Sequence, residues 1–183
     1  MISIKNLRVK FKDTVIENFN LEIEKNGIYC LFAPSGAGKT TLLNAVSKLI
    51  KFEGEIKIDG EISYLFQEDR LLNWFSAREN IMLVEPDEEK AEYYMTVFGV
   101  DEFADKKPQE LSGGMKRRCA LVRALAFKAD VYLLDEPFRG LDEQNADLVR
   151  KEIIELGKEK IVIVVTHDEL DLEKLNAQRI TLN

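Results

Sequence analysis

The sequence predicts an α/β fold with a mainly parallel core sheet, an antiparallel β region at the N-terminus and an inserted helical region. Three observations support this fold class. Apolar and polar residues alternate near the N-terminus, which is typical of half-buried antiparallel strands. Three later runs are apolar without alternation, which is typical of parallel strands buried on both faces. Helical stretches separate these runs, as in proteins that alternate strands and helices.

Residues 1–30 supply the predicted antiparallel strands. Their alternating apolar residues are Ile2, Ile4, Leu7, Val9, Phe11, Leu21 and Ile23. We expect segments 55–60 and 62–66 to extend the same sheet, because both alternate in the same way. Asp59 and Gly60, at the end of the first segment, are typical of a hairpin turn.

The predicted parallel strands are the apolar runs 28–32, 131–134 and 161–165, and residues 179–182 are also strand-like. We expect helices over residues 42–46, 77–84, 90–97 and 115–127. These elements describe one domain over residues 1–183, which is an ordinary domain length. Residues of about 1–66 and 128–183 would form the core with its β region, and about 67–127 the helical subdomain.

Bulk composition narrows the class of protein. Hydrophobic residues make up 45% and charged residues 32%, which is typical of a globular rather than a disordered chain. A net charge of −7 argues against a nucleic-acid partner, and we expect the basic run 116–118 to lie on a solvated helix face. The longest apolar run is too short to span a membrane and no signal-peptide region opens the chain, which predicts a cytoplasmic protein. Cys30 and Cys119 are expected to be buried and inert.

A glycine-containing loop at residues 33–41 joins the first apolar run to a helix. Gly36 and Gly38 let backbone N–H groups approach phosphate oxygens, and the helix N-terminus adds a positive field. Lys39 would contact the β- and γ-phosphates of a nucleotide, and Thr40 would bind Mg²⁺. The alternative is a flexible turn before a helix. The candidate nucleotide-binding residues of the loop are Ser35, Gly36, Ala37, Gly38, Lys39, Thr40 and Thr41.

Two carboxylates and the only histidine follow the other apolar runs. Asp135 and Glu136 are adjacent at the end of a strand and should point to opposite sides, which suits two different roles. Asp135 would hold Mg²⁺ through water, and Glu136 would polarise the attacking water. His167 would contact the γ-phosphate and orient Glu136. The candidate catalytic residues are therefore Glu136, His167 and Lys39. The alternative for Asp135 and Glu136 is a polar turn that ends the strand, and the alternative for His167 is a structural role. Because ligands bind at the carboxyl ends of parallel strands, Lys39, Asp135 and His167 should meet at one sheet edge.

A second anion-binding turn is predicted at residues 111–115. Ser112 is a natural N-cap, and Gly113 and Gly114 follow it at the start of a helical run. Glycine costs helix stability relative to alanine, and Met115 cannot complete a capping box. N–H groups that bind an anion therefore explain this turn better than a plain helix start.

With these motifs, nearly the whole chain resembles the ATP-binding-cassette (ABC) family. The matching residues are Phe11, 33–41, Gln67, 111–115, 133–137, 140–142 and His167. The resemblance implies an ATPase of the P-loop type that uses ATP and Mg²⁺, with Phe11 stacking on adenine. The resemblance assigns Thr40, Gln67 and Asp135 to the Mg²⁺ site.

The same resemblance implies a head-to-tail dimer, with a homodimer expected. The signature residues Ser112, Gly113 and Gly114 would contact the ATP of the partner subunit, and Asp142 would cross the interface. Ala33, Phe11 and Met115 depart from the family's usual glycine, tyrosine and glutamine. We expect neither the Phe11 nor the Met115 departure to abolish activity, and Ala33 is small enough for close approach to the phosphates.

A narrower resemblance concerns what the ATPase drives. Residues 66–72, together with 111–115, look like ATPase subunits of bacterial importers for nitrate, sulfonate and taurine. This implies a separate membrane permease, an extracellular solute-binding protein that acts indirectly, and a peripheral position on the inner face of the cell membrane. The alternative function is a cytosolic ABC ATPase that is not coupled to transport, with a nucleic-acid or regulatory role. A set of apolar residues forms either a groove for a permease helix or ordinary core, and comprises Leu71, Leu72, Trp74 and Phe75.

Overall fold

The computed structural model describes residues 1–11, 14–34 and 36–182. The antiparallel sheet contains, in order, β2 (Thr14–Ile23), β1 (Ile2–Lys10) and β4 (Glu53–Ile58). The parallel sheet contains, in order, β5 (Ile62–Leu65), β6 (Val131–Asp135), β7 (Ile161–Val165), β3 (Gly27–Phe32) and β8 (Gln178–Thr181). The expected parallel core and N-terminal antiparallel sheet are both present.

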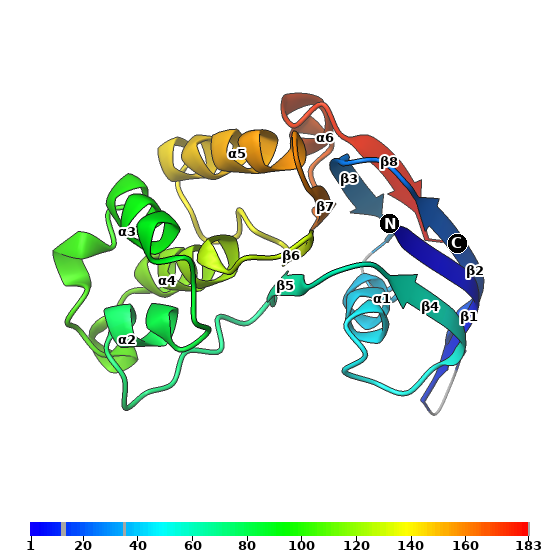
Figure 1. Ribbon diagram of the computed structural model, residues 1–183, viewed down its shortest axis with the longest axis horizontal. Helices are drawn as coiled ribbons and strands as arrows, with labels where there is room; N and C mark the ends of the chain where they lie inside the picture. Colours follow the sequence, from blue (N-terminus) through cyan, green and yellow to red (C-terminus); the bar gives the residue numbers. More distant parts are fainter. Residues whose placement is uncertain (12–13, 35, 183) are drawn as a thin grey trace.

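Helices cover the two faces of the parallel sheet. The α-helices are α1 (Lys39–Val46), α2 (Ala77–Met82), α3 (Glu88–Val97), α4 (Gly113–Ala126), α5 (Glu143–Gly157) and α6 (Glu169–Lys174). The 3-10 helices are η1 (Asp101–Phe103) and η2 (Pro108–Glu110). Figure 1 shows α2, α3 and α4 on one side of the parallel sheet, with α1 and the antiparallel sheet on the other. Among the described residues, no helix is both long and apolar enough to cross a membrane.

Burial on both faces explains the unbroken apolar run of β6. Val131 and Leu133 pack into a cluster with α1 and the antiparallel sheet. Tyr132 and Leu134 pack into a second cluster with the helices of the opposite face. Polar residues at any of these positions would be buried without water, so the strand cannot alternate.

The prediction for residues 62–66 is wrong in its sheet assignment. β5 pairs in parallel with β6, from Ile62 opposite Val131 to Leu65 opposite Leu134. Alternation reports that one face of a strand is buried, and an edge strand of a parallel sheet meets that condition as well as an antiparallel strand does. Gly60, with φ 90°, therefore does not close a hairpin but lies where the chain passes from one sheet to the other.

The two cysteines behave as predicted. Cys30 on β3 and Cys119 on α4 are both fully buried free thiols. Desolvation is the main cause that raises the pKa of each thiol to about 12. Both therefore stay protonated and pack as small apolar side chains.

Candidate active site

The carboxyl ends of β3, β6 and β7 meet at one edge of the parallel sheet. β7 lies between the other two strands, and Val165 at its end is paired with Leu31 on one side and Asp135 on the other. A cavity of about 270 Å³ opens beside this edge. Its lining brings together Gly36, Gly38, Lys39, Thr40, Thr41, Gln67, Asp135, Glu136, Val165 and His167. The expected meeting of Lys39, Asp135 and His167 is confirmed.

Backbone geometry at the glycine loop turns the chain from β3 into α1. Gly38 has φ 93°, and a Cβ there would lie 2.8 Å from the Val15 side chain, so both the conformation and the close approach require glycine. Gly36, with φ 81°, has open space around it and needs only the backbone freedom. Ala37 N–H donates to the Pro34 carbonyl at 3.1 Å. Ser35 lies outside the described residues.

Lys39 begins α1 and is almost fully buried. Its Nζ donates hydrogen bonds to the carbonyl oxygens of Ala33 at 2.6 Å and Pro34 at 3.1 Å. These two carbonyls belong to the loop that Lys39 closes, so the ammonium group is held within the loop rather than in solvent. The loop therefore concentrates positive charge and backbone N–H groups at the end of β3.

Asp135 is the last residue of β6 and is only 1% exposed. Its Oδ2 accepts a hydrogen bond from Thr40 Oγ1 at 2.7 Å. Burial is the largest cause that raises the pKa of this carboxyl, and the Thr40 hydrogen bond opposes it. The ionised carboxylate is therefore desolvated, and a cation beside it would relieve that cost.

Glu136 departs from the strand geometry that the sequence predicts. β6 ends at Asp135, and Glu136 takes a left-handed conformation with φ 50°. Strand alternation therefore does not apply, and both carboxylates line the same cavity instead of pointing to opposite sides. Glu136 Oε1 lies 2.7 Å from His167 Nε2, and Gln67 Nε2 donates to Glu136 Oε2 at 3.4 Å.

The signature turn lies outside this cavity. Ser112 is exposed and caps α4 by accepting a hydrogen bond from Met115 N–H at 3.3 Å, as predicted for an N-cap. Gly113 lines a neighbouring cavity of about 300 Å³ that Gln67 also lines. Phe11 lies just beyond the end of β1 and is 60% exposed. The cavity at the strand ends therefore contains neither the signature turn nor the predicted adenine-stacking ring.

The prediction that the basic run 116–118 forms a solvated helix face is wrong for Arg117. This residue is only 3% exposed. Its guanidinium group donates to the carbonyl oxygens of Phe66, Asp135 and Glu136. A helical pattern of charges does not reveal which one faces inward when its partners are backbone carbonyls at distant strand ends.

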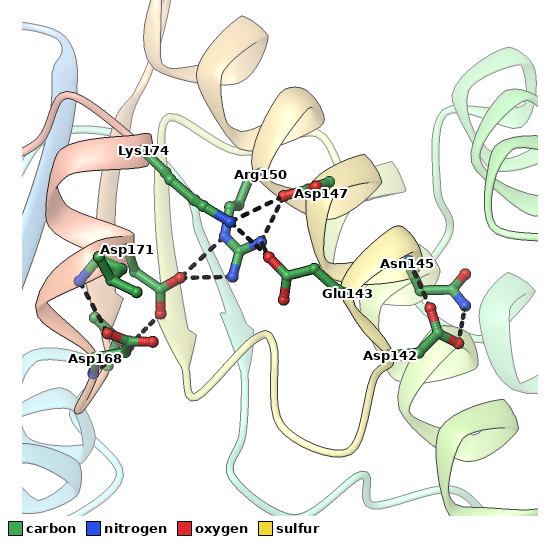
Figure 2. A network of polar contacts seen from close by, with 10 residues as sticks. Asp142, Glu143, Asn145, Asp147, Arg150, Asp168, Asp171 and Lys174 are labelled. Carbon is green, nitrogen blue, oxygen red and sulfur yellow. Dashed lines mark hydrogen bonds and ion pairs between the residues drawn. The ribbon is translucent and has the colours of Figure 1, made fainter.

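A network of ion pairs between α5 and α6 reaches Thr166, the residue before His167, and was not predicted. Figure 2 shows Arg150 of α5 reaching Asp171 of α6, and Arg150 Nε donates to Asp171 Oδ1 at 2.9 Å. Asp171 Oδ2 in turn accepts from Thr166 Oγ1 at 2.6 Å, next to His167. Both members of the Arg150–Asp171 pair are buried. Asp142 begins the same helix α5 as its N-cap, accepting from Asn145 N–H at 2.9 Å.

Comparison with known proteins decides the family. A family model described as "ABC transporter" matches residues 16–139, which is more than half of the chain. The chain belongs to the ABC transporter family. The dimeric structure of the ATP-binding cassette MJ0796 in a post-hydrolysis state with ADP and Pi superposes on this ABC protein with a TM-score of 0.89. That match is 28% identical and covers 100% of this chain and 94% of the other.

Curated relatives point the same way. The aliphatic sulfonates import ATP-binding protein SsuB of Bacillus cereus is 38% identical over 170 residues, or 84% of this chain and 68% of that protein. The bicarbonate transport ATP-binding protein CmpD of Synechocystis sp. is 34% identical over 85% of this chain and 62% of that protein. The nitrate import ATP-binding protein NrtD of Synechococcus elongatus is 33% identical over 84% of this chain and 64% of that protein. This ABC protein therefore spans about two thirds of their length.

Family membership and structural match confirm the P-loop ABC fold and the activity expected from the motifs. The protein is an ATP-binding ABC ATPase.

Proposed function

We propose that this ABC ATPase binds ATP with Mg²⁺ at the carboxyl ends of β3, β6 and β7 and drives import of a small solute through a separate permease. The observation that carries this proposal is the convergence of Lys39, Thr40, Asp135, Glu136 and His167 around one cavity. The alternative, an ABC ATPase uncoupled from transport, is not favoured, because the relatives described above are named as import or transport ATP-binding proteins.

Oxygen donors in the cavity fit a magnesium ion. Thr40 Oγ1 and Asp135 Oδ2 lie 2.7 Å apart, and Gln67 lines the same cavity. Hydroxyl, amide and carboxylate oxygens suit this hard cation, and nucleotide phosphates commonly complete its shell. No cluster of three or more His, Cys, Asp or Glu in the described part of the chain could hold a metal by itself. We therefore assign Thr40, Gln67 and Asp135 to Mg²⁺ that arrives with ATP, where it would neutralise phosphate charge.

Glu136 is the proposed general base. Its carboxylate lines the cavity and is held by His167 Nε2 at 2.7 Å, so it can accept a proton from a water placed between it and the γ-phosphate. His167 would orient this carboxylate and contact the γ-phosphate. Lys39 would exchange its contacts with Ala33 and Pro34 for the β- and γ-phosphates, so that its charge follows the transferring group.

The remaining nucleotide contacts are proposed for the loop and for Phe11. Backbone N–H groups at the start of α1 would bind phosphate oxygens, and the exposed Phe11 ring would stack on adenine. The loop residues assigned to the nucleotide are Ser35, Gly36, Ala37, Gly38, Lys39, Thr40 and Thr41.

A head-to-tail dimer would complete the site. The matched cassette structures are dimers. Ser112 and Gly113 are exposed at the positive end of the 14-residue helix α4, so they can meet the ATP of a second copy. Gly114 would join them in this contact. Asp142, also exposed, would lie at the interface.

A permease helix would dock on the segment between β5 and α4. An apolar cavity of about 420 Å³ is lined there by residues that include Leu72, Leu83 and Phe127. Trp74, within this segment, is 67% exposed, whereas Leu71 packs against the core. This supports a role for the exposed Leu72 and Trp74 in partner binding and a core role for Leu71. We propose that 1–183 is one ABC ATPase domain in which about 67–127 form a helical subdomain that carries this surface.

The protein would then lie on the inner face of the cell membrane, and an extracellular solute-binding protein would act on it only through the permease. The test is to co-express the chain with a permease encoded beside it and to measure association and ATP hydrolysis in membranes. Association, with turnover altered by the permease, is expected. Turnover without association with any neighbouring permease would favour the uncoupled alternative.

A further inference from the structure

Arg117 lies on α4, five positions after Ser112, and joins that helix to the strand ends of the ATP site. Its Nη1 donates to the Phe66 carbonyl at 2.8 Å and to Asp69 Oδ1 at 3.2 Å. Its Nη2 donates to the carbonyls of Asp135 at 2.6 Å and Glu136 at 2.7 Å. One buried guanidinium group therefore connects the ends of the neighbouring strands β5 and β6.

The carbonyls that Arg117 holds belong to residues that matter for the ATP site. Phe66 directly precedes Gln67, and Asp135 and Glu136 are the two carboxylates that line the cavity. Moving α4 relative to the parallel sheet would therefore pull on the backbone at both Gln67 and Glu136.

Glu136 needs such support because its backbone conformation is unfavourable for a residue with a side chain. Its φ is 50°, in the left-handed region. Its N–H donates to the Val165 carbonyl at 3.0 Å, and its carbonyl accepts from Arg117. The peptide groups on either side of Glu136 are thus held from two directions, by β7 and by α4, which fixes where its carboxylate lies.

The segment after β5 is held by a second arginine of the same helix. Arg123 donates to the Asp69 carbonyl at 2.7 Å and the Arg70 carbonyl at 3.0 Å. Arg117 differs from Arg123 because it alone of the two also reaches the end of β6. It is the member of the pair that connects the segment around Gln67 to Glu136.

We propose that Arg117 is a positioning residue that couples the signature helix α4 to Gln67 and Glu136 of its own subunit. The inference rests on the roles proposed above for these two residues. In a head-to-tail dimer, contact between Ser112 and the partner's ATP would shift α4, and Arg117 would transmit that shift to the ATP site of its own chain. Arg117 thereby links the two nucleotide sites of the dimer.

The test compares Arg117→Gln, Arg117→Lys and the matched control Arg118→Gln. Arg118 is the next residue on α4 and also donates to a backbone carbonyl, that of Phe98 at 2.7 Å. Phe98 is the C-cap of helix α3, so this contact joins two helices and does not reach the strand ends. For each variant, kcat, the ATP dissociation constant and Tm are measured with Mg²⁺ and ATP.

Arg117→Gln should lower kcat by about 10- to 100-fold, the size of effect expected when a reacting group is displaced by about an ångström. Its ATP dissociation constant should change less than about threefold, because the phosphate loop is untouched. Arg117→Lys should recover part of kcat, since an ammonium group can still bind one or two of the carbonyls. Arg118→Gln should keep kcat within about threefold of the unmodified chain even where its Tm falls.

A double variant separates positioning from general damage. In a Glu136→Gln background, Arg117→Gln should lower turnover no further, because two residues that act through one group are not additive. Multiplying losses, unchanged kcat in Arg117→Gln, or equal kcat losses in Arg117→Gln and Arg118→Gln would each overturn the inference. Full turnover in Glu136→Gln alone would instead reject the proposed base, and the kcat and binding values of the single Arg117 variants would still decide whether α4 is coupled to the site.

Discussion

The adjacent carboxylates of Asp135 and Glu136 have different surroundings, and this difference suits different roles. Asp135 is buried against Thr40, whereas the Glu136 side chain is 17% exposed and contacts His167 and Gln67 in the same cavity. Burial raises the pKa of Asp135, so its ionised form is costly until a cation lies beside it. The residue proposed to bind Mg²⁺ and the residue proposed to accept a proton thus differ in burial and do not lie on opposite faces of a strand.

Asp135→Asn tests this account. An amide can still accept the Thr40 hydrogen bond but carries no buried charge, so we expect Tm without nucleotide to rise by a few degrees, given that 1 kcal/mol corresponds to about 2–4 °C at this size. Magnesium-dependent ATP hydrolysis should fall by about 100-fold or more. Thermal scans and steady-state assays on both proteins provide the measurement.

The effect of Asp135→Asn on thermal stability should depend on pH in one direction. Folding raises the pKa of the Asp135 carboxyl. Below the unfolded-state pKa the carboxyl is protonated in both the folded and the unfolded state, so its ionisation does not change the free energy of unfolding there. As pH rises through the raised pKa, the wild-type protein loses stability that Asp135→Asn keeps. The Tm advantage of the variant should therefore be larger at pH 7 than below pH 4. An advantage that shrinks with rising pH would contradict the assignment of burial as the dominant cause.

The helices α5 and α6 are tied together behind the histidine by the Arg150–Asp171 pair, and this contact belongs to neither helix alone. Arg150 also contacts Glu143 and Asp147 on its own helix, as Figure 2 shows. The exposed partners add little, because solvent screens such pairs. Asp171 is the buried partner, and it also binds Thr166 beside His167.

Arg150→Met should destabilise the protein strongly. Removing one partner of a buried pair leaves an unpaired charge on Asp171, which typically costs about 3–5 kcal/mol of unfolding free energy. The matched control is Lys174→Met, whose ammonium group contacts Glu143 from an exposed position and should change stability by no more than about 0.5 kcal/mol. Urea unfolding measures the free energy of unfolding of both variants. Equal losses of unfolding free energy would show that the buried pair stabilises the protein no more than the exposed pair does.

The whole molecule presents its phosphate loop and its signature turn as separate surfaces. Gly113 lines a cavity beside the one that contains Lys39, with Gln67 shared between the two. The matched cassette structures are dimeric. In the head-to-tail dimer proposed above, a second copy would bring a signature turn to each loop. ATP would then stabilise the dimer because it binds the closed arrangement in preference to the open one.

Glu136→Gln should trap this dimer. The amide cannot accept the proton of the attacking water, so ATP stays bound and the apparent mass with Mg²⁺ and ATP should reach twice the 21.0 kDa of one chain. Light scattering after size-exclusion chromatography measures this mass. The double variant Lys39→Ala with Glu136→Gln is the control and should remain monomeric, because it loses the principal positive charge for ATP. A monomeric Glu136→Gln variant saturated with ATP would contradict the proposed dimer.

The positions of the main site residues were predictable because each follows a strand that is buried on both faces. Unbroken apolar runs mark such strands locally, and the carboxyl ends of parallel neighbours meet at one edge. Lys39, Asp135 and His167 accordingly line one cavity. The N-cap role of Ser112 was equally local, since its partner Met115 is three residues away.

Local sequence therefore determined the family motifs, the buried strands and the residues at their ends, because these depend on composition and spacing within a few residues. Only the tertiary structure decided that β5 joins the parallel sheet, that Arg117 lies inside, and that Arg150 pairs with Asp171. Those outcomes depend on partners far away in the chain, such as the Phe66 carbonyl that lies 51 positions from Arg117. An alternating strand or a charged helix turn has the same pattern whichever distant partner it meets, and burial is settled only when the elements pack.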